Sequence, residues 1–400
     1  MDRLVLLAFA SLVSFSPIAA QTDTTEVVVL GVHHSAMLVA EDYQPAVFRA
    51  YFDRVAPDAI CVERAPEEFA RGSHYEFTYE IQHIAVPWAR ENGVTLCPFD
   101  WLPAEEDQLL AFGVDLTETP FLRAPGSYAS FLAFGDSADL TRDLFYAEAQ
   151  TDRDENRAWY LAMAERPRHD FARRLFLYRT FMQAMRVARA AQAHPGGRLL
   201  VIVGSMHKDD IERILADQPG LRVVQPPSFG RPNAAEVARA IVDHDLHAIA
   251  TFNVLGLQPL TGVLNSRWIE EVVTRLERSR TPETALLRTR LDVVAGRLDA
   301  VTAAQRYEEI ASRVEADERF TWDGVLDRRR LDSFFDPFGN LTVADRARLE
   351  RARELRRAGR TEESDRSIAE LAATLTPLKA AQLRSYWDTW VVGPPPMPPR

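Results

Sequence analysis

Two short apolar runs dominate the pattern of apolar and polar positions, and each ends in a glycine followed three residues later by a histidine. The first covers residues 27–35 (VVVLGVHHS) and the second covers residues 199–207 (LLVIVGSMH). Continuous runs rich in β-branched residues are typical of strands buried on both faces of a parallel sheet. Glycine at the end of such a strand predicts a sharp turn or a close approach to a ligand. The histidines then fall beyond the strands, where open α/β sheets bind their ligands.

The segments between these runs alternate between helical and extended patterns, which predicts an α/β fold with a mostly parallel sheet flanked by helices. A bend at Pro87 and a cap at Gly93 are expected in one of the helices. The predicted helices of this part are 42–56, 75–92, one from 152 and one over 169–193, and the further strands are 59–62, 94–98, 221–224 and 248–255. The irregular pattern of residues 102–150 predicts short helices or a lid.

Beyond about residue 261 the chain becomes rich in arginine and glutamate, and its apolar positions follow a helical period. The amphipathic segments are 266–279, 283–297, 301–315, 343–357 and 361–374. We therefore divide the chain into a signal peptide (1–20), an α/β domain (21–260), a helical region (261–393) and a proline-rich tail (394–400).

Composition narrows the class of protein. The chain has 400 residues, of which 46% are hydrophobic, and this is ample for a globular core. Its net charge of −11 argues against nucleic acid as a partner.

The first twenty residues resemble a secretory signal, with Arg3, an apolar centre over 4–13 and small residues before Gln21. An uncleaved anchor is the alternative, and no later stretch is long and apolar enough to span a membrane. We expect an exported, periplasmic protein.

Cys61 and Cys97 fall in two predicted strands. Export permits a disulfide, but bridging neighbouring parallel strands usually strains the bond. Buried free thiols are therefore favoured.

Four candidate side chains follow predicted strands: His34, Glu63, Asp100 and His207. Neighbouring parallel strands bring such groups to one edge of a sheet. Two imidazoles and a carboxylate suit a divalent metal that activates water, with Asp100 orienting a ligand or sharing as general base.

Each candidate also has a structural interpretation. The histidines can cap helices or satisfy buried hydrogen bonds, Glu63 can pair with an arginine, and Asp100 can be a helix N-cap. His244 and His247 are expected in a solvated turn.

The paired motifs Gly31-Val32-His33-His34 and Gly204-Ser205-Met206-His207, with Glu63 between them, resemble the GxxH motifs of the TraB/TIKI (GumN-like) group. This group lies in the superfamily that includes erythromycin esterase and ChaN-like proteins, and the resemblance covers about residues 27–215. It implies a metal-dependent hydrolase with His34, Glu63 and His207 as ligands of a divalent ion such as Mn, Co or Zn.

The chain departs from that pattern between the two motifs, where the family usually has arginine-asparagine ahead of a helix. Here the sequence is Asp154-Glu155-Asn156-Arg157, so Arg153 or Arg157 is the candidate to stabilise an anionic intermediate.

Two functions remain open. The first is an exported hydrolase of a small molecule or peptide, cleaving a peptide or ester bond, either metal-dependent or metal-free with His34 as general base and Glu63 as its orienting partner. The second is a non-catalytic periplasmic binding or assembly protein that uses the α/β domain as scaffold and has a protein partner on the helical region.

Overall fold

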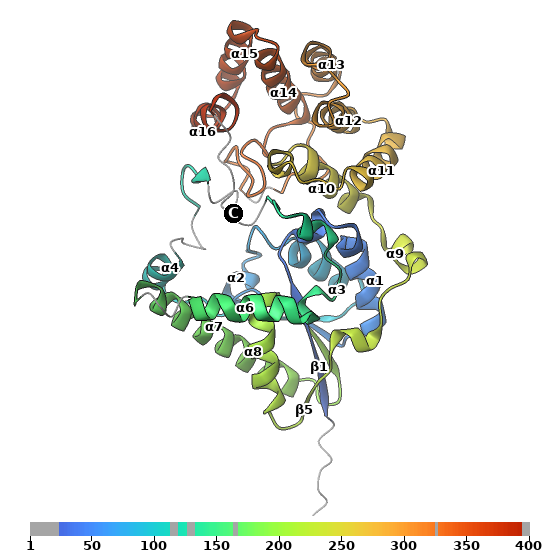
Figure 1. The fold of residues 1–400 in the computed structure, drawn as a ribbon, viewed down its shortest axis with the longest axis vertical. Coiled ribbons are helices and arrows are strands. Elements are labelled where there is room, and N and C mark those ends of the chain that lie inside the picture. The colour runs from blue at the N-terminus through green and yellow to red at the C-terminus, as the bar shows by residue number, and fades with distance from the viewer. Residues whose placement is uncertain (1–23, 113–118, 126–132, 163–166, 325–326, 394–400) are drawn as a thin grey trace, which may run out of the picture.

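The computed structural model describes residues 24–112, 119–125, 133–162, 167–324 and 327–393. The predicted signal peptide and the proline-rich tail lie outside this part. At its centre is an all-parallel sheet of five strands in the order β3-β2-β4-β1-β5 (Figure 1). The strands are β1 (Thr25–Val32), β2 (Ala59–Val62), β3 (Thr95–Pro98), β4 (Arg198–Gly204) and β5 (Leu221–Val223). The predicted α/β fold with a parallel sheet is confirmed.

Both faces of the sheet are buried, which explains the unbroken apolar runs. In β1, Val27 and Val29 face one hydrophobic cluster, whereas Val28 and Leu30 face another, as the alternation of side chains in a strand requires. Helices α7 (Pro167–Gln192) and α8 (Ser205–Ala216) cover the first face. The second face packs against α1 (Pro45–Val55), α3 (Val86–Glu91) and helices further along the chain. The other α-helices before α10 in the described part of the chain are α2 (Pro66–Ala70), α4 (Glu105–Phe112), α6 (Gln150–Ala162) and α9 (Ala234–Ala240).

The last predicted strand, 248–255, is wrong, because this segment lies in helix α10 (Asp243–Val254). Every residue from Asp245 to Val254 is buried, so no polar face breaks the apolar run and its period cannot separate strand from helix. His244 and His247 therefore lie in a helix and not in a turn. His247 is buried, and its Nδ1 lies 2.8 Å from Oε1 of Glu283.

The helical region contains all five predicted amphipathic helices. They are α11 (Ser266–Leu276), α12 (Pro282–Val294), α13 (Ala300–Arg313), α14 (Val343–Arg357) and α15 (Thr361–Thr374). A sixth helix, α16 (Pro377–Trp387), was not predicted. In Figure 1 these helices form the upper part of the molecule together with α10.

One hydrophobic core joins the α/β part to the helical part. It contains Val28 and Leu200 of the sheet, Phe252 of α10 and Leu287 of α12. A second cluster, formed mainly by α14, α15 and α16, lies at the far end of the helical region. The boundary predicted near residue 260 thus crosses a continuous core.

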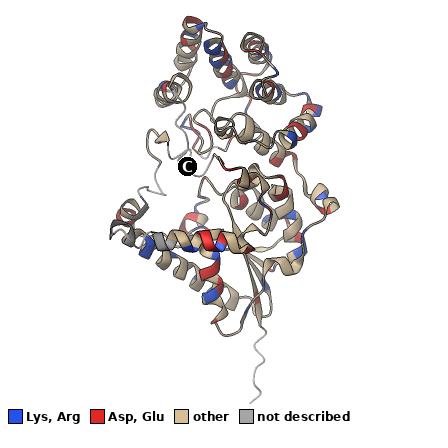
Figure 2. Ribbon diagram, in the orientation of Figure 1, with Lys and Arg blue, Asp and Glu red and all other residues tan. Residues whose placement is uncertain are grey.

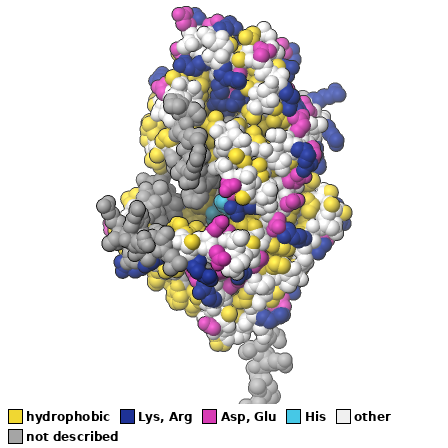
Figure 3. Space-filling view, viewed as in Figure 1, with side chains coloured by type: hydrophobic (Ala, Val, Ile, Leu, Met, Phe, Trp, Pro, Cys, Tyr) yellow, Lys and Arg dark blue, Asp and Glu magenta, His cyan; other side chains and the backbone are white. Residues whose placement is uncertain are grey.

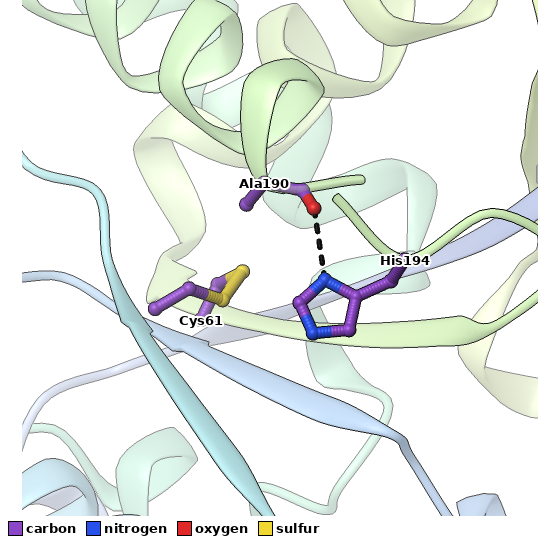
Figure 4. Close-up of a disulfide and its surroundings, with 4 residues drawn as sticks. Cys61, Ala190 and His194 are labelled. Atoms are coloured by element: carbon purple, nitrogen blue, oxygen red, sulfur yellow. Dashed lines mark hydrogen bonds between the residues drawn. A yellow bond between two sulfur atoms is a disulfide. The ribbon is translucent and has the colours of Figure 1, made fainter. Parts of the chain in front are cut away.

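Cys61 and Cys97 form a disulfide (Figure 4), so the prediction of free thiols is wrong. The two residues are direct partners in the register of β2 and β3, and their Cα atoms are 4.3 Å apart. This separation is close to the lower end of the range that disulfides span, about 4.4 Å, so a bridge forms between neighbouring strands.

Charged residues of both signs occur in both halves of the molecule (Figure 2). Within the described part of the chain, no helix is long and apolar enough to cross a bilayer.

Candidate active site

The four candidate side chains converge at the carboxyl edge of the sheet. His34 follows β1, Glu63 follows β2, Asp100 follows β3, and His207 lies in the first turn of α8 after β4. Nε2 of His34 is 3.9 Å from Oε2 of Glu63, and Nε2 of His207 is 3.6 Å from Oε1 of Glu63. The strand order places β2 and β1 on either side of β4, so the prediction that these residues meet at one edge agrees with the structure.

An arginine that the sequence analysis did not select, Arg179 of α7, connects the cluster. Its Nε and Nη2 donate to the two carboxylate oxygens of Asp100 at 2.9 and 2.7 Å. Nη2 also donates to Oε1 of Glu63 at 2.9 Å, and Nη1 donates to Nε2 of His207 at 3.0 Å. A single buried guanidinium therefore uses its donors on three of the four candidates.

The two carboxylates in contact with Arg179 are ionised. Burial alone would raise the pKa of Glu63, but Arg179 and then the two histidines outweigh it and lower this pKa. The pKa of Asp100 is lowered in the same way by Arg179, helped by hydrogen bonds from Tyr75 and Gln183. Asp100 also accepts a 2.8 Å bond from the backbone N–H of Trp101. With its oxygens fully used, Asp100 is suited to positioning Arg179 and not to accepting a substrate proton.

His207 is neutral, and its ring is fixed. Burial lowers its pKa to about 3. Because a guanidinium can only donate, Nε2 of His207 accepts from Arg179, and Nδ1 carries the proton that is donated to Oγ1 of Thr180 at 2.6 Å. The ring stacks on Phe176 at 4.2 Å. The lone pair of His207 is thus occupied, so this residue cannot serve as the base in this arrangement.

His34 has a different partner, which the sequence analysis also missed. Its Nδ1 lies 2.6 Å from Oε1 of Glu80, a fully buried residue in the π-helical turn η3 (Glu80–Ala85). Burial would lower the pKa of His34, but Glu80 and then Glu63 outweigh it and raise this pKa. Oε2 of Glu80 has no hydrogen-bond partner among the described residues. π-Helical turns are frequent at functional sites, where they redirect a side chain.

His34 is also the most accessible member of the cluster. Its side chain is 15% exposed, against 4% for Glu63 and 3% for His207. Figure 3 shows histidine surface in a hollow between the α/β part and the helical part. His34 is thus the member of this cluster that is most open to solvent.

The backbone around His34 is held in an uncommon conformation. Ser35 has a φ of 62°, in the left-handed region that residues other than glycine rarely adopt. Its hydroxyl donates to the carbonyl of Phe77 at 2.6 Å, which anchors this turn to the segment before Glu80. Such strain persists only where the surroundings enforce it, and it is common at functional sites.

The two motif glycines are required for space and not for a turn. Neither has a positive φ. A Cβ on Gly204 would lie 3.0 Å from Nε2 of His34, and its N–H donates to Oε2 of Glu63 at 2.7 Å. A Cβ on Gly31 would lie 2.8 Å from Cβ of Ala147. Gly204 thus keeps room beside His34, whereas Gly31 permits packing of the neighbouring loop.

Arg153 and Arg157, the predicted stabilisers of an anionic intermediate, pair elsewhere. Nη2 of Arg153 donates to Glu148 at 3.1 Å, and Nη1 of Arg157 lies 3.5 Å from the exposed Asp154. Neither makes a contact with the four candidates among the described residues. The arginine that does so is Arg179 of α7.

The predicted metal ligands do not fit a divalent ion as they stand. The guanidinium of Arg179 occupies the position between Nε2 of His207 and Oε1 of Glu63, where an ion shared by them would lie. A cation placed there would meet this positive charge at contact distance. In the described part of the chain, no group of three or more histidine, cysteine, aspartate and glutamate side chains is arranged to hold a metal.

No family model, curated protein or solved structure matches this chain. The resemblance to the TraB/TIKI group stays a prediction from the two GxxH motifs and Glu63.

Proposed function

We propose that the protein is an exported hydrolase of ester or peptide bonds in which His34 is the general base. The observation that carries this proposal is the 2.6 Å contact between Nδ1 of His34 and Oε1 of Glu80. A carboxylate that accepts from Nδ1 fixes the tautomer in which Nε2 has a free lone pair, and it stabilises the imidazolium after proton transfer. The orienting partner is thus Glu80, and not Glu63 as expected from the sequence.

Glu63 has a different role in this proposal. Its Oε2 lies 3.9 Å from Nε2 of His34, so one water molecule beside the two atoms can hydrogen-bond to both. His34 removes a proton from this water as the oxygen attacks the carbonyl carbon of the substrate. The tetrahedral intermediate then collapses, and the imidazolium of His34 protonates the leaving oxygen or nitrogen.

Arg179, Asp100 and His207 position the reacting groups. Arg179 keeps Glu63 ionised and holds its carboxylate beside the water. Asp100 fixes Arg179 by accepting two hydrogen bonds from it, and His207 accepts a further one. Rigid placement of this kind is worth several kcal/mol in catalysis.

The disulfide supports the exported location. Disulfides form and persist in oxidising compartments and are rare in the cytosol of mesophiles. The bridge between Cys61 and Cys97 agrees with the predicted signal peptide and with maturation in the periplasm.

The test is hydrolysis of p-nitrophenyl esters and peptide p-nitroanilides by the wild type and by His34→Ala. We expect His34→Ala to lose about 10²- to 10⁴-fold in kcat/KM, the usual contribution of a general base. His194→Ala is the matched control, because His194 bonds to the carbonyl of Ala190 away from the cluster (Figure 4). Equal activity of His34→Ala and the wild type on every cleaved substrate would refute the proposal.

A metal-dependent form of the same hydrolase is the second candidate. The observation in its favour is charge: Glu63 and Asp100 share Arg179 and Glu80 pairs with His34, so three carboxylates gather at this edge of the sheet and favour cations. It requires Arg179 to move from between Glu63 and His207. Metal analysis of the wild type and of His34→Ala with His207→Ala separates the forms. The metal-free form predicts activity retained in chelator, whereas stoichiometric metal lost in the double variant supports the other.

A further inference from the structure

A cavity of about 460 Å³ lies in the helical region, at the seam between the two hydrophobic clusters. Leu255 and Val293 of the shared core line one side, and Leu257, Phe338 and Trp390 of the second cluster line the other. Its volume falls in the range of small-molecule pockets, about 300–1,000 Å³, which often occur where packed units meet.

The charged groups on the wall of this cavity are mostly arginines. Arg290, Arg353, Arg356 and Arg357 line it, whereas Asp336 is the only acidic lining residue in the described part of the chain. Asp336 already forms an ion pair with the buried Arg346. Behind the wall these arginines pair with carboxylates: Arg290 and Arg357 with Glu354 at 3.3 and 2.7 Å, and Arg356 with Asp365 at 3.3 Å. The wall itself therefore presents more arginines than carboxylates, next to apolar side chains.

Arg353 is the least well bonded of these four arginines. Its guanidinium lies 3.3 Å from Oε2 of Glu350 but forms no hydrogen bond to any described residue, although its side chain is only 17% exposed. Burial lowers the pKa of Arg353, because Glu350 does not fully offset it and Arg290 and Arg346 repel the charge. Guanidinium groups have five donors and are rarely left so poorly bonded when shielded from water.

We propose that this cavity binds an amphiphilic anion, with its carboxylate or phosphate head on Arg353 and Arg356 and its apolar body against Leu260 and Trp390. Both head groups accept the paired donors of a guanidinium in the same way. The site is separate from the cluster around His34, and the proposal goes beyond hydrolysis.

Titration calorimetry on the purified full chain tests this with two probes, octanoate and octyl phosphate. The first has a carboxylate head on an apolar chain, and the second has a phosphate head. Acetate lacks the apolar body, and octanol lacks the charge. We expect one molecule of octanoate or octyl phosphate to bind per chain, and acetate and octanol to bind at least about tenfold more weakly.

Two variants locate the site. Arg353→Gln should weaken binding of the anion about tenfold or more, whereas Arg348→Gln on the same helix should not, because Arg348 pairs with Asp345 and does not line the cavity. Leu260→Asp should abolish binding, since Leu260 lines the cavity yet is 40% exposed and so tolerates a charge in the folded chain. Equal binding of octanol and octanoate, or binding unchanged in both Arg353→Gln and Leu260→Asp, would overturn the proposal, as would no binding of either anion at millimolar concentration.

Discussion

Two buried networks of charged residues occur in the described part of the chain, and they are arranged differently. At the edge of the sheet, Arg179 pairs with Glu63 and Asp100, while Glu80 pairs with His34. In the helical region the lining of the cavity has four arginines and one aspartate. Burial magnifies such imbalances, because the surrounding dielectric no longer screens them.

This difference indicates whether a network is suited to carrying a proton or to binding an anion. Glu80 and then Glu63 raise the pKa of His34 against the effect of burial, which suits this imidazole to carrying a proton. Burial lowers the pKa of Arg353 and Glu350 does not fully offset it, so an anion bound beside Arg353 would stabilise its charge. We therefore propose proton transfer at the first network and anion binding at the second.

The largest expected effect comes from breaking the first network at its centre. Arg179→Met leaves Glu63 and Asp100 buried without their counter-ion, which should lower the free energy of unfolding by about 3–5 kcal/mol. Urea unfolding followed by circular dichroism measures this loss. A loss below about 1 kcal/mol would mean that Arg179 does not hold the network together.

The disulfide should matter nearly as much, and only the sheet-edge network lies beside it. Cys61 and Cys97 are 36 residues apart and precede Glu63 and Asp100 by a few positions. Replacing both by serine should cost about 2–4 kcal/mol and should lower hydrolysis while leaving octanoate binding unchanged at temperatures where the variant is folded. Equal loss of both functions would contradict the local role of the bridge.

A smaller and more specific effect is expected on the pH dependence of hydrolysis. His34 must be unprotonated to act as base, so kcat/KM should rise with pH through its raised pKa. Glu80→Gln removes the charge that raises this pKa, so the rise should move to lower pH while the plateau falls about tenfold or more. Glu350→Gln, in the other network, is the control and should leave the profile in place.

The smallest effect is expected at Arg157, which is exposed and lies 3.5 Å from Asp154. Arg157→Ala should change the free energy of unfolding by less than about 0.5 kcal/mol and leave hydrolysis unchanged. A substantial loss of activity would restore the role in catalysis that the sequence suggested for this residue.

The sequence predicted those features that a short segment of the chain encodes by itself. The two apolar runs with GxxH identified β1 and β4, and the strand ends predicted that His34, Glu63 and His207 meet. Glu80 and Arg179 were missed because they reach the site from helical segments distant along the chain. A signal for Arg179 existed: Arg179, Gln183 and Arg186 recur at helical spacing and form a polar stripe on a helix that covers a buried sheet.

The errors have related causes. The segment of α10 is apolar on every side, so its pattern could not distinguish a buried helix from a buried strand. The disulfide depended on strand register, which places Cys61 directly opposite Cys97 and which no local pattern encodes.

The hydrophobic core that runs from β1 through α10 to α12 couples the stability of the α/β part to that of the helical part. Deleting residues 261–400 would remove part of the hydrophobic core that packs on the sheet. Loss of function in the truncated chain would therefore not show which half carries that function. The same continuity means that any molecule seated between α12 and α14 favours the native state by mass action. Occupancy at that remote seam would then also protect the edge of the sheet around His34 against heat.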